Sequence, residues 1–132
     1  MGAEFYSYWV PGECEPAAAL RRLRAETFAS GAFRGADLKP ASPELATESA
    51  GASGTGSILD IARIAESEEP GAANGLDAEE MEMYFNTRFP TRQEIEGCDP
   101  LAQDIGSGSS RYIAAYENGK CAGLVFMGYS FD

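Results

Sequence analysis

The strongest constraint on the fold is a β-hairpin signal near the C-terminus, centred on Asn118-Gly119. These two residues separate two runs, 111–117 and 120–126, that are rich in aromatic and branched apolar side chains. Asn-Gly favours the type I′ turn, whose twist matches that of two antiparallel strands. A two-residue turn also sets the register and pairs Ile113 with Leu124. We therefore predict an antiparallel hairpin over this segment.

In this register the two faces of the hairpin differ. One face is almost entirely aliphatic, with Ile113, Ala115, Ala122, Leu124 and Phe126. The other carries three tyrosines separated by small residues, namely Tyr112, Tyr116 and Tyr129 with Ala114 and Gly123. The aliphatic face is the better candidate for the core. The tyrosine face is a candidate platform for a small molecule or a protein, although ordinary packing against the first strand is the favoured explanation.

Short-range signals predict further elements before the hairpin. Pro16 at a first helical position and Gly31 at a C-terminal stop bracket one helix. Capping patterns begin two short helices at Asp77 and Thr91. Residues 58–64 are ambiguous between strand and helix, and their β-branched side chains favour a strand. In chain order we expect a strand at 4–10, a helix at 16–30, a strand at 58–64, and short helices from Asp77 to about Phe85, from Thr91 and from Asp99-Pro100.

Two segments show no periodicity. Residues 35–57 consist largely of Ala, Ser, Thr, Gly and Pro, and Ser42-Pro43-Glu44 is suited to start one short helical turn. A connection of this length in a compact domain is usually functional or disordered, so a mobile flap and an ordered functional loop both remain open. Residues 66–75 have the composition of an acidic turn.

Together these elements predict one domain over residues 1–132, with 35–57 as a long loop. The fold class expected is α+β. We expect a small antiparallel sheet of three to four strands that includes the C-terminal hairpin, with the helices packed on one face.

Charge is concentrated in the middle of the chain. The sequence has 21 Asp and Glu against 10 Lys and Arg, for a formal net charge of −11. Residues 41–110 hold 14 of the acids and three of the cations, whereas both ends are neutral. A field of one sign speeds encounter with basic partners and repels phosphate backbones. We therefore expect a basic protein partner and no nucleic acid.

Two sets of carboxylates are candidate functional groups. Glu79, Glu80 and Glu82 fall on one predicted helix, where they form either a solvated face or part of a partner surface. Asp60 falls among apolar residues of the predicted strand at 58–64, and a half-buried carboxylate needs a partner. That partner is expected to be Arg63 or Arg111, unless Asp60 is itself a functional acid.

Catalytic and cofactor chemistry finds little support. The sequence has no histidine, which excludes Ser-His-Asp and Cys-His catalysis and every histidine-ligated metal site. The glycine-rich stretch 51–57 lacks the lysine of a phosphate-binding loop, and both Gly54-Thr55-Gly56 and Gly106-Ser107-Gly108 lack the third glycine of the dinucleotide-binding pattern. We expect no enzyme activity, no cofactor and no metal.

The cysteines and the apolar runs bear on the compartment. Cys14, Cys98 and Cys121 are an odd number at wide spacing, which argues against a disulfide framework and for free thiols in a reducing cytosol. We see no signal-peptide pattern and no apolar run long enough to cross a bilayer. The expectation is a cytoplasmic protein without membrane association, in an oligomeric state that the sequence leaves open.

Three blocks carry a resemblance to known sequences: residues 5–11, 54–61 and 128–132. They resemble a group of small uncharacterised bacterial proteins, and the high Arg and Ala content fits a GC-rich bacterial genome. This resemblance implies no activity, ligand or residue role.

Two hypotheses for function follow. The first is a non-catalytic interaction module, of the size and charge of bacterial immunity or inhibitor proteins, that presents its acidic segment to a basic partner. The second is a small-ligand-binding domain that uses the tyrosine-lined face beneath residues 35–57. An enzyme that pairs Asp60 with a tyrosine is a third and weaker hypothesis.

Overall fold

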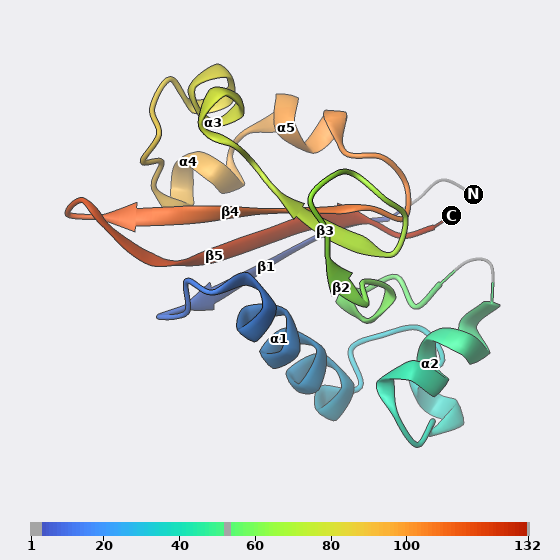
Figure 1. Cartoon of the computed structure of the whole chain (residues 1–132). Helices are drawn as coiled ribbons and strands as arrows, with labels where there is room; N and C mark the ends of the chain where they lie inside the picture. The colour runs from blue at the N-terminus through green and yellow to red at the C-terminus, as the bar shows by residue number, and fades with distance from the viewer. Residues whose placement is uncertain (1–3, 52–53, 132) are drawn as a thin grey trace.

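A five-stranded sheet with helices on both sides organises the computed structural model, which describes residues 4–51 and 54–131 (Figure 1). The strands are β1 Phe5–Pro11, β2 Arg63–Ile64, β3 Ala72–Gly75, β4 Ser110–Glu117 and β5 Lys120–Tyr129. The α-helices are α1 Pro16–Ser30, α2 Pro43–Ala50, α3 Ala78–Phe85, α4 Arg92–Glu96 and α5 Asp99–Asp104, and the short 3-10 turns are η1 Ala36–Leu38 and η3 Ile58–Asp60.

The sheet is mixed, in the order β1-β5-β4-β3-β2. β5 pairs antiparallel with both β1 and β4, whereas β3 pairs parallel with β4 and with β2. The α+β class is confirmed, but the expectation of three to four antiparallel strands is wrong. β3 has the sequence Ala-Ala-Asn-Gly, which carries no strand pattern, and its hydrogen bonds come from neighbours distant in the chain.

Parallel pairing explains why helices cover both faces. The chain must cross over from the end of β3 to the start of β4, and α3, α4 and α5 form this crossover on one face (Figure 1). α1 and η3 pack on the opposite face, where α2 contacts η3. The prediction that the helices pack on one face is therefore wrong.

Each face of the sheet has its own apolar core. The core under α1 includes Val10, Leu20, Leu23, Ile58, Leu124 and Phe126. The core under α3–α5 includes Met81, Ile95, Leu101, Ile113, Val125 and Met127. Because the central strands are covered on both sides, their side chains are apolar in both directions.

The elements predicted from capping and turn chemistry are confirmed. Glu15 accepts a hydrogen bond from the Ala18 backbone N–H at the start of α1, and Gly31 ends the helix in the left-handed conformation. Both α3 and α4 begin with complete capping boxes. Asn118 and Gly119 have positive φ, as a type I′ turn requires.

A β-bulge changes the predicted hairpin register. Tyr116 pairs with Cys121 as expected, but Ala115 pairs with Gly123, which leaves Ala122 as an extra residue in β5. Beyond the bulge Ile113 faces Val125 rather than Leu124. A shift of one residue moves every later side chain to the other face, so Ile113 shares its core with Val125 and Met127 instead of Leu124 and Phe126.

The segment between α1 and β3 contains short helices, and one of them begins at the helical turn predicted for Ser42-Pro43-Glu44. Residues 35–57 hold η1 and α2, so the predicted long loop contains a helix, which Ser42 caps through the Leu45 backbone N–H. The strand expected at 58–64 is reduced to β2, because η3 occupies Ile58–Asp60. The acidic turn expected at 66–75 ends in β3.

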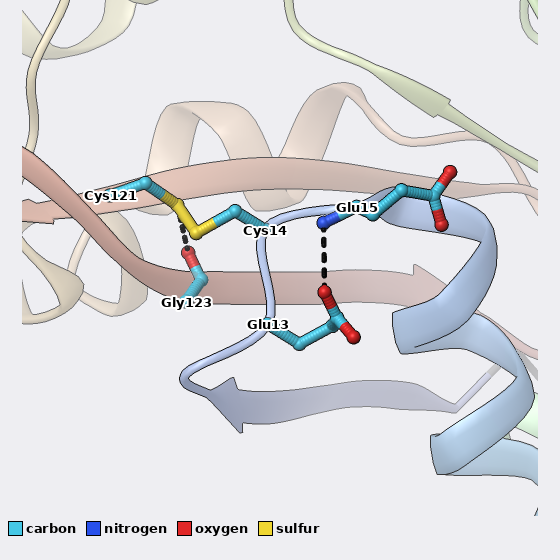
Figure 2. The surroundings of a disulfide bond; sticks show 5 residues. All are labelled: Glu13, Cys14, Glu15, Cys121 and Gly123. Carbon is cyan, nitrogen blue, oxygen red and sulfur yellow. Dashed lines mark hydrogen bonds between the residues drawn. A yellow bond between two sulfur atoms is a disulfide. The ribbon is translucent and has the colours of Figure 1, made fainter.

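The expectation of three free cysteines is wrong. Cys14, which precedes α1, forms a disulfide with Cys121 of β5, and Cys98 is the free cysteine of the described residues (Figure 2). The two cysteines are 107 residues apart in the sequence, so no local spacing pattern predicts that they pair. A reducing cytosol therefore no longer follows from the cysteines.

Candidate functional site

More than half of the acidic residues of the middle segment lie on one side of the sheet. Residues 77–104, which contain α3–α5, carry eight carboxylates and two arginines. Residues 16–51, which contain α1 and α2, carry five cations and four carboxylates. The two groups of helices lie on opposite sides of the sheet (Figure 1), so the helical segments on the two sides differ in charge. We call the α3–α5 side the acidic layer.

α3 presents carboxylates outward from a well-defined start. The Asp77 carboxylate accepts a hydrogen bond from the Glu80 backbone N–H at 2.8 Å, and the Glu80 carboxylate accepts one from the Asp77 N–H at 3.1 Å. Met81 is buried against the sheet, whereas Glu79 and Glu82 are exposed. Two of the three predicted glutamates are therefore available to a partner.

Glu80, the third of these glutamates, has a structural role, because it forms an ion pair with Arg111. Its carboxylate lies 2.8 Å from the guanidinium of Arg111, whose side chain is only 12% exposed. Arg111 also donates to the backbone carbonyls of Asn74 and Gly75 in β3. Arg111, expected as a partner of Asp60, instead joins α3 to the sheet.

A second polar contact joins α3 to α5. The Tyr84 hydroxyl donates a hydrogen bond to the Asp104 carboxylate. Burial, followed by this hydrogen bond, raises the pKa of Tyr84 to about 12. The phenol therefore stays protonated at neutral pH and keeps the two helices together.

Two large apolar side chains are exposed on the acidic layer. Met83 is 67% exposed on α3, and Phe89 is 59% exposed in the segment that follows. An ion pair of 3.0 Å between Glu82 and Arg88 connects the neighbours of these two residues. The Phe89 ring packs edge-on against Tyr116, with 5.0 Å between ring centroids. The acidic layer thus combines carboxylates with apolar side chains that are mostly exposed to solvent.

The three tyrosines of the predicted platform do not share one open face. Tyr112 lies over the α1 core, 5.8 Å from the Phe126 ring, whereas Tyr129 lies on the opposite side of the sheet against Phe5. The bulge at Ala122 separates them, because it changes which residues of β5 share a face with β4.

Tyr116 lines a separate surface hollow. This hollow has a volume of about 460 Å³ and lies between Trp9, α4 and the end of the hairpin. Two of the lining residues form a cation–π contact, with the Arg92 guanidinium 5.0 Å from the Trp9 ring centroid. One predicted tyrosine is therefore next to a space of small-molecule size.

Asp60 is buried, and its hydrogen-bond partners are not arginines. The carboxylate, on a residue 4% exposed, accepts hydrogen bonds from the Thr55 backbone N–H at 2.7 Å and the Thr55 hydroxyl at 2.8 Å. A third comes from the Gly56 N–H at 3.2 Å. The expectation of Arg63 or Arg111 as partner is wrong, because backbone and hydroxyl donors four and five residues earlier in the chain hydrogen-bond to the carboxylate. Arg63 pairs with Glu69 instead.

The charge of Asp60 contributes to the pKa values of two tyrosines, Tyr6 and Tyr8. Burial raises the pKa of Tyr6 well above its ordinary value, and the Asp60 carboxylate raises it further. The pKa of Tyr8 is raised by burial, with a smaller contribution from Asp60. The Tyr6 hydroxyl has no hydrogen-bond partner among the described residues, and the nearby Ser110 hydroxyl donates to the Met127 carbonyl. Both phenols stay neutral, and the Asp60 hydrogen bonds organise the loop before η3.

Sequence reasoning missed Met83 and Phe89 as surface residues. The helical period supplied a signal for Met83, because Met81 faces the core and a residue two positions later points away from it. Phe89 lies outside any helix, so only the tertiary structure shows that it is exposed.

Within residues 4–51 and 54–131, no group of three His, Cys, Asp or Glu side chains is placed to hold a metal ion. None of the helices described there has the length and apolar character needed to cross a bilayer. Comparison of the chain with protein-family models, with curated proteins and with solved structures finds no match.

Proposed function

We propose that this protein is a non-catalytic interaction module that binds a basic protein partner through the acidic layer. The observation that carries the proposal is the exposure of Met83 and Phe89 among the carboxylates of that layer. Apolar side chains ringed by charge are typical of protein-binding surfaces. The opposite helical layer also exposes two leucines, Leu38 and Leu45, but the charge of residues 16–51 is close to neutral.

The proposed roles divide between the two kinds of side chain. Met83 and Phe89 would supply the desolvated centre, where most binding energy resides. Glu79 and Glu82 would lie at its edge, where charge mainly speeds association and selects the sign of the partner. The ion pair of Glu80 with Arg111 supports this surface, because it holds α3 in place before any partner arrives.

A capture experiment from the source cell at two salt concentrations tests the proposal. We expect the wild type to retain a protein of net positive charge, and the Met83→Ala/Phe89→Ala variant to lose it. The matched control is Leu38→Ala/Leu45→Ala, which removes two exposed leucines from the α1–α2 side. Equal retention by the acidic-layer variant and the wild type would overturn the proposal.

Two matched double variants test the contribution of the exposed carboxylates to partner binding. Glu79→Gln/Glu82→Gln removes two charges from the acidic layer, and Glu26→Gln/Glu48→Gln removes two from α1 and α2. Each pair includes one glutamate that is ion-paired to an arginine, Glu82 and Glu26 respectively. Retention should fall and lose its salt dependence only in the first variant.

A small-ligand-binding domain is the second candidate. The hollow beside Tyr116 and Trp9 favours it, because its volume of about 460 Å³ lies in the range of small-molecule sites. It has less support than the interaction module, since Tyr112 and Tyr129 lie on opposite faces of the sheet. Saturable binding of any small molecule that shifts the Trp9 fluorescence, and that Tyr116→Ala abolishes, would favour it.

A further inference from the structure

A groove of about 630 Å³ lies on the other side of the sheet from the acidic layer. Its walls are α1, the first turn of α2 and residues 62–64. The apolar lining comes from Ala17, Leu20, Ala25, Pro43 and Ile64. The alanines of α1 leave the space open, because larger side chains at these positions would reach across to the opposite wall.

Charged groups of the groove are mainly cationic. Arg21, Arg24 and Arg63 line it together with one carboxylate, Glu44. Arg63 is already ion-paired with Glu69, and Glu44 offsets a second guanidinium. One positive charge therefore remains in excess, in a protein whose net charge is −11.

Arg24 is held in position before any ligand binds. Its guanidinium donates to the backbone carbonyls of Leu59 at 2.7 Å and Ile61 at 2.5 Å. Burial lowers the pKa of Arg24, and the carboxylates of Glu44 and Asp60 raise it, so Glu44 lies within reach of its charge. A carbonyl partner leaves the positive charge of a guanidinium uncancelled.

Arg21 completes the charged rim. It lies on α1 one residue after Leu20, is exposed, and has no hydrogen-bond or ion-pair partner among the residues that the structure describes. Its neighbour Arg22 differs, because it is paired with Glu26 at 3.3 Å. Arg21 is therefore the guanidinium with most freedom to meet an incoming anion.

We propose that this groove binds a small amphipathic carboxylate. The hydrocarbon body of the ligand lies along the apolar wall, and its carboxylate meets Arg21 and Arg24. A volume of about 630 Å³ fits a small molecule rather than a folded partner. A monoanion matches the single excess charge, whereas a dianionic phosphate is opposed more strongly by the acidic protein as a whole.

Octanoate is the probe for a titration followed by calorimetry and by backbone amide NMR. We expect saturable binding with shifts in α1 and in residues 62–64, and binding of octanamide at least about tenfold weaker. Arg21→Gln should weaken octanoate binding about tenfold, and Arg22→Gln, its matched control, should leave it unchanged. Glu44→Gln should strengthen binding, because it removes the competing carboxylate.

Three results would overturn this proposal: no saturable binding of octanoate, equal affinity for octanoate and octanamide, or equal effects of the Arg21 and Arg22 variants. Tighter binding of octyl phosphate than of octanoate would overturn the assignment to a monoanion. These variants lie outside the acidic layer, so failure here leaves the capture experiment with Met83 and Phe89 intact.

Discussion

The carboxylate of Glu80 meets the guanidinium of Arg111 at 2.8 Å, and this contact fastens α3 of the acidic layer to β4. Glu80→Gln removes the charge but keeps the capping box, in which glutamine serves as well as glutamate. We expect a loss of about 1–3 kcal/mol in the free energy of unfolding, because Arg111 is left without its anion in a mostly buried position. Urea denaturation measures it. Glu79→Gln, on the exposed side of the same helix, should change stability by less than about 0.5 kcal/mol, and equal effects of the two would contradict the structural role of the pair.

Asp60 is predicted to act on stability. In Asp60→Asn, an amide nitrogen replaces one carboxylate oxygen and opposes a backbone or hydroxyl donor from Thr55 or Gly56. The expected loss in the free energy of unfolding is about 1–3 kcal/mol, measured by chemical denaturation. Asp37→Asn, an exposed carboxylate in η1, is the control. A fully stable Asp60→Asn protein would show that these hydrogen bonds do not support the fold.

Gly54 must stay small because Asp60 occupies the adjacent space. A Cβ at Gly54 would lie 2.6 Å from a carboxylate oxygen of Asp60, and the residue has a φ of +72°. Gly119 has a φ of +77°, but a Cβ there meets nothing within 4 Å. Gly54→Ala should therefore destabilise the protein by about 1–3 kcal/mol more than Gly119→Ala. Thermal unfolding of the two variants side by side measures the difference, and equal melting temperatures would rule out the clash.

The disulfide between Cys14 and Cys121 is expected to contribute strongly to stability. It closes a loop across most of the chain, which restricts the unfolded state and contributes about 2–4 kcal/mol. Cys14→Ser/Cys121→Ser should lower the denaturation midpoint to that of the reduced wild type, and Cys98→Ser should leave it unchanged. Alkylation of the unreduced, denatured wild type followed by mass spectrometry should label one cysteine; labelling of three would refute the pairing.

Tyr6 links stability to alkaline pH. Its pKa is raised above the ordinary value of 10.0 by burial and then by Asp60, so the unfolded chain loses the phenol proton before the folded protein does. The stability from Tyr6 is complete below pH 10 and is lost as pH rises toward the folded pKa, with a slope of up to about 1.4 kcal/mol per pH unit. Tyr6→Phe should match the wild type at pH 7, where the hydroxyl has no partner among the described residues, and should lose stability less steeply above pH 10. Parallel slopes in denaturation series at several pH values would contradict this.

Much of the secondary structure follows from chemistry within four or five residues. Capping by Asp77 and Thr91 and the turn at Asn118-Gly119 require no distant contact, and each of these elements lies where its residues predict. The concentration of acid in residues 41–110 is also a property of the sequence alone. These features can be predicted from the sequence because the hydrogen bonds or charges that define them involve residues close together in the chain.

Tertiary structure decided the features that depend on partners far away in the chain. β3 is a strand because β2 and β4 flank it, and Cys14 reaches Cys121 across 107 residues. The bulge at Ala122 decides which side chains of β5 share a face with Ile113 and Tyr112 of β4. The candidate surfaces belong to this second group. The acidic segment and the C-terminal hairpin follow from composition and from local turn chemistry. The parallel crossover through α3–α5 places eight of that segment's acidic residues on one face, because a chain that joins parallel strands must carry its helices across one side of the sheet.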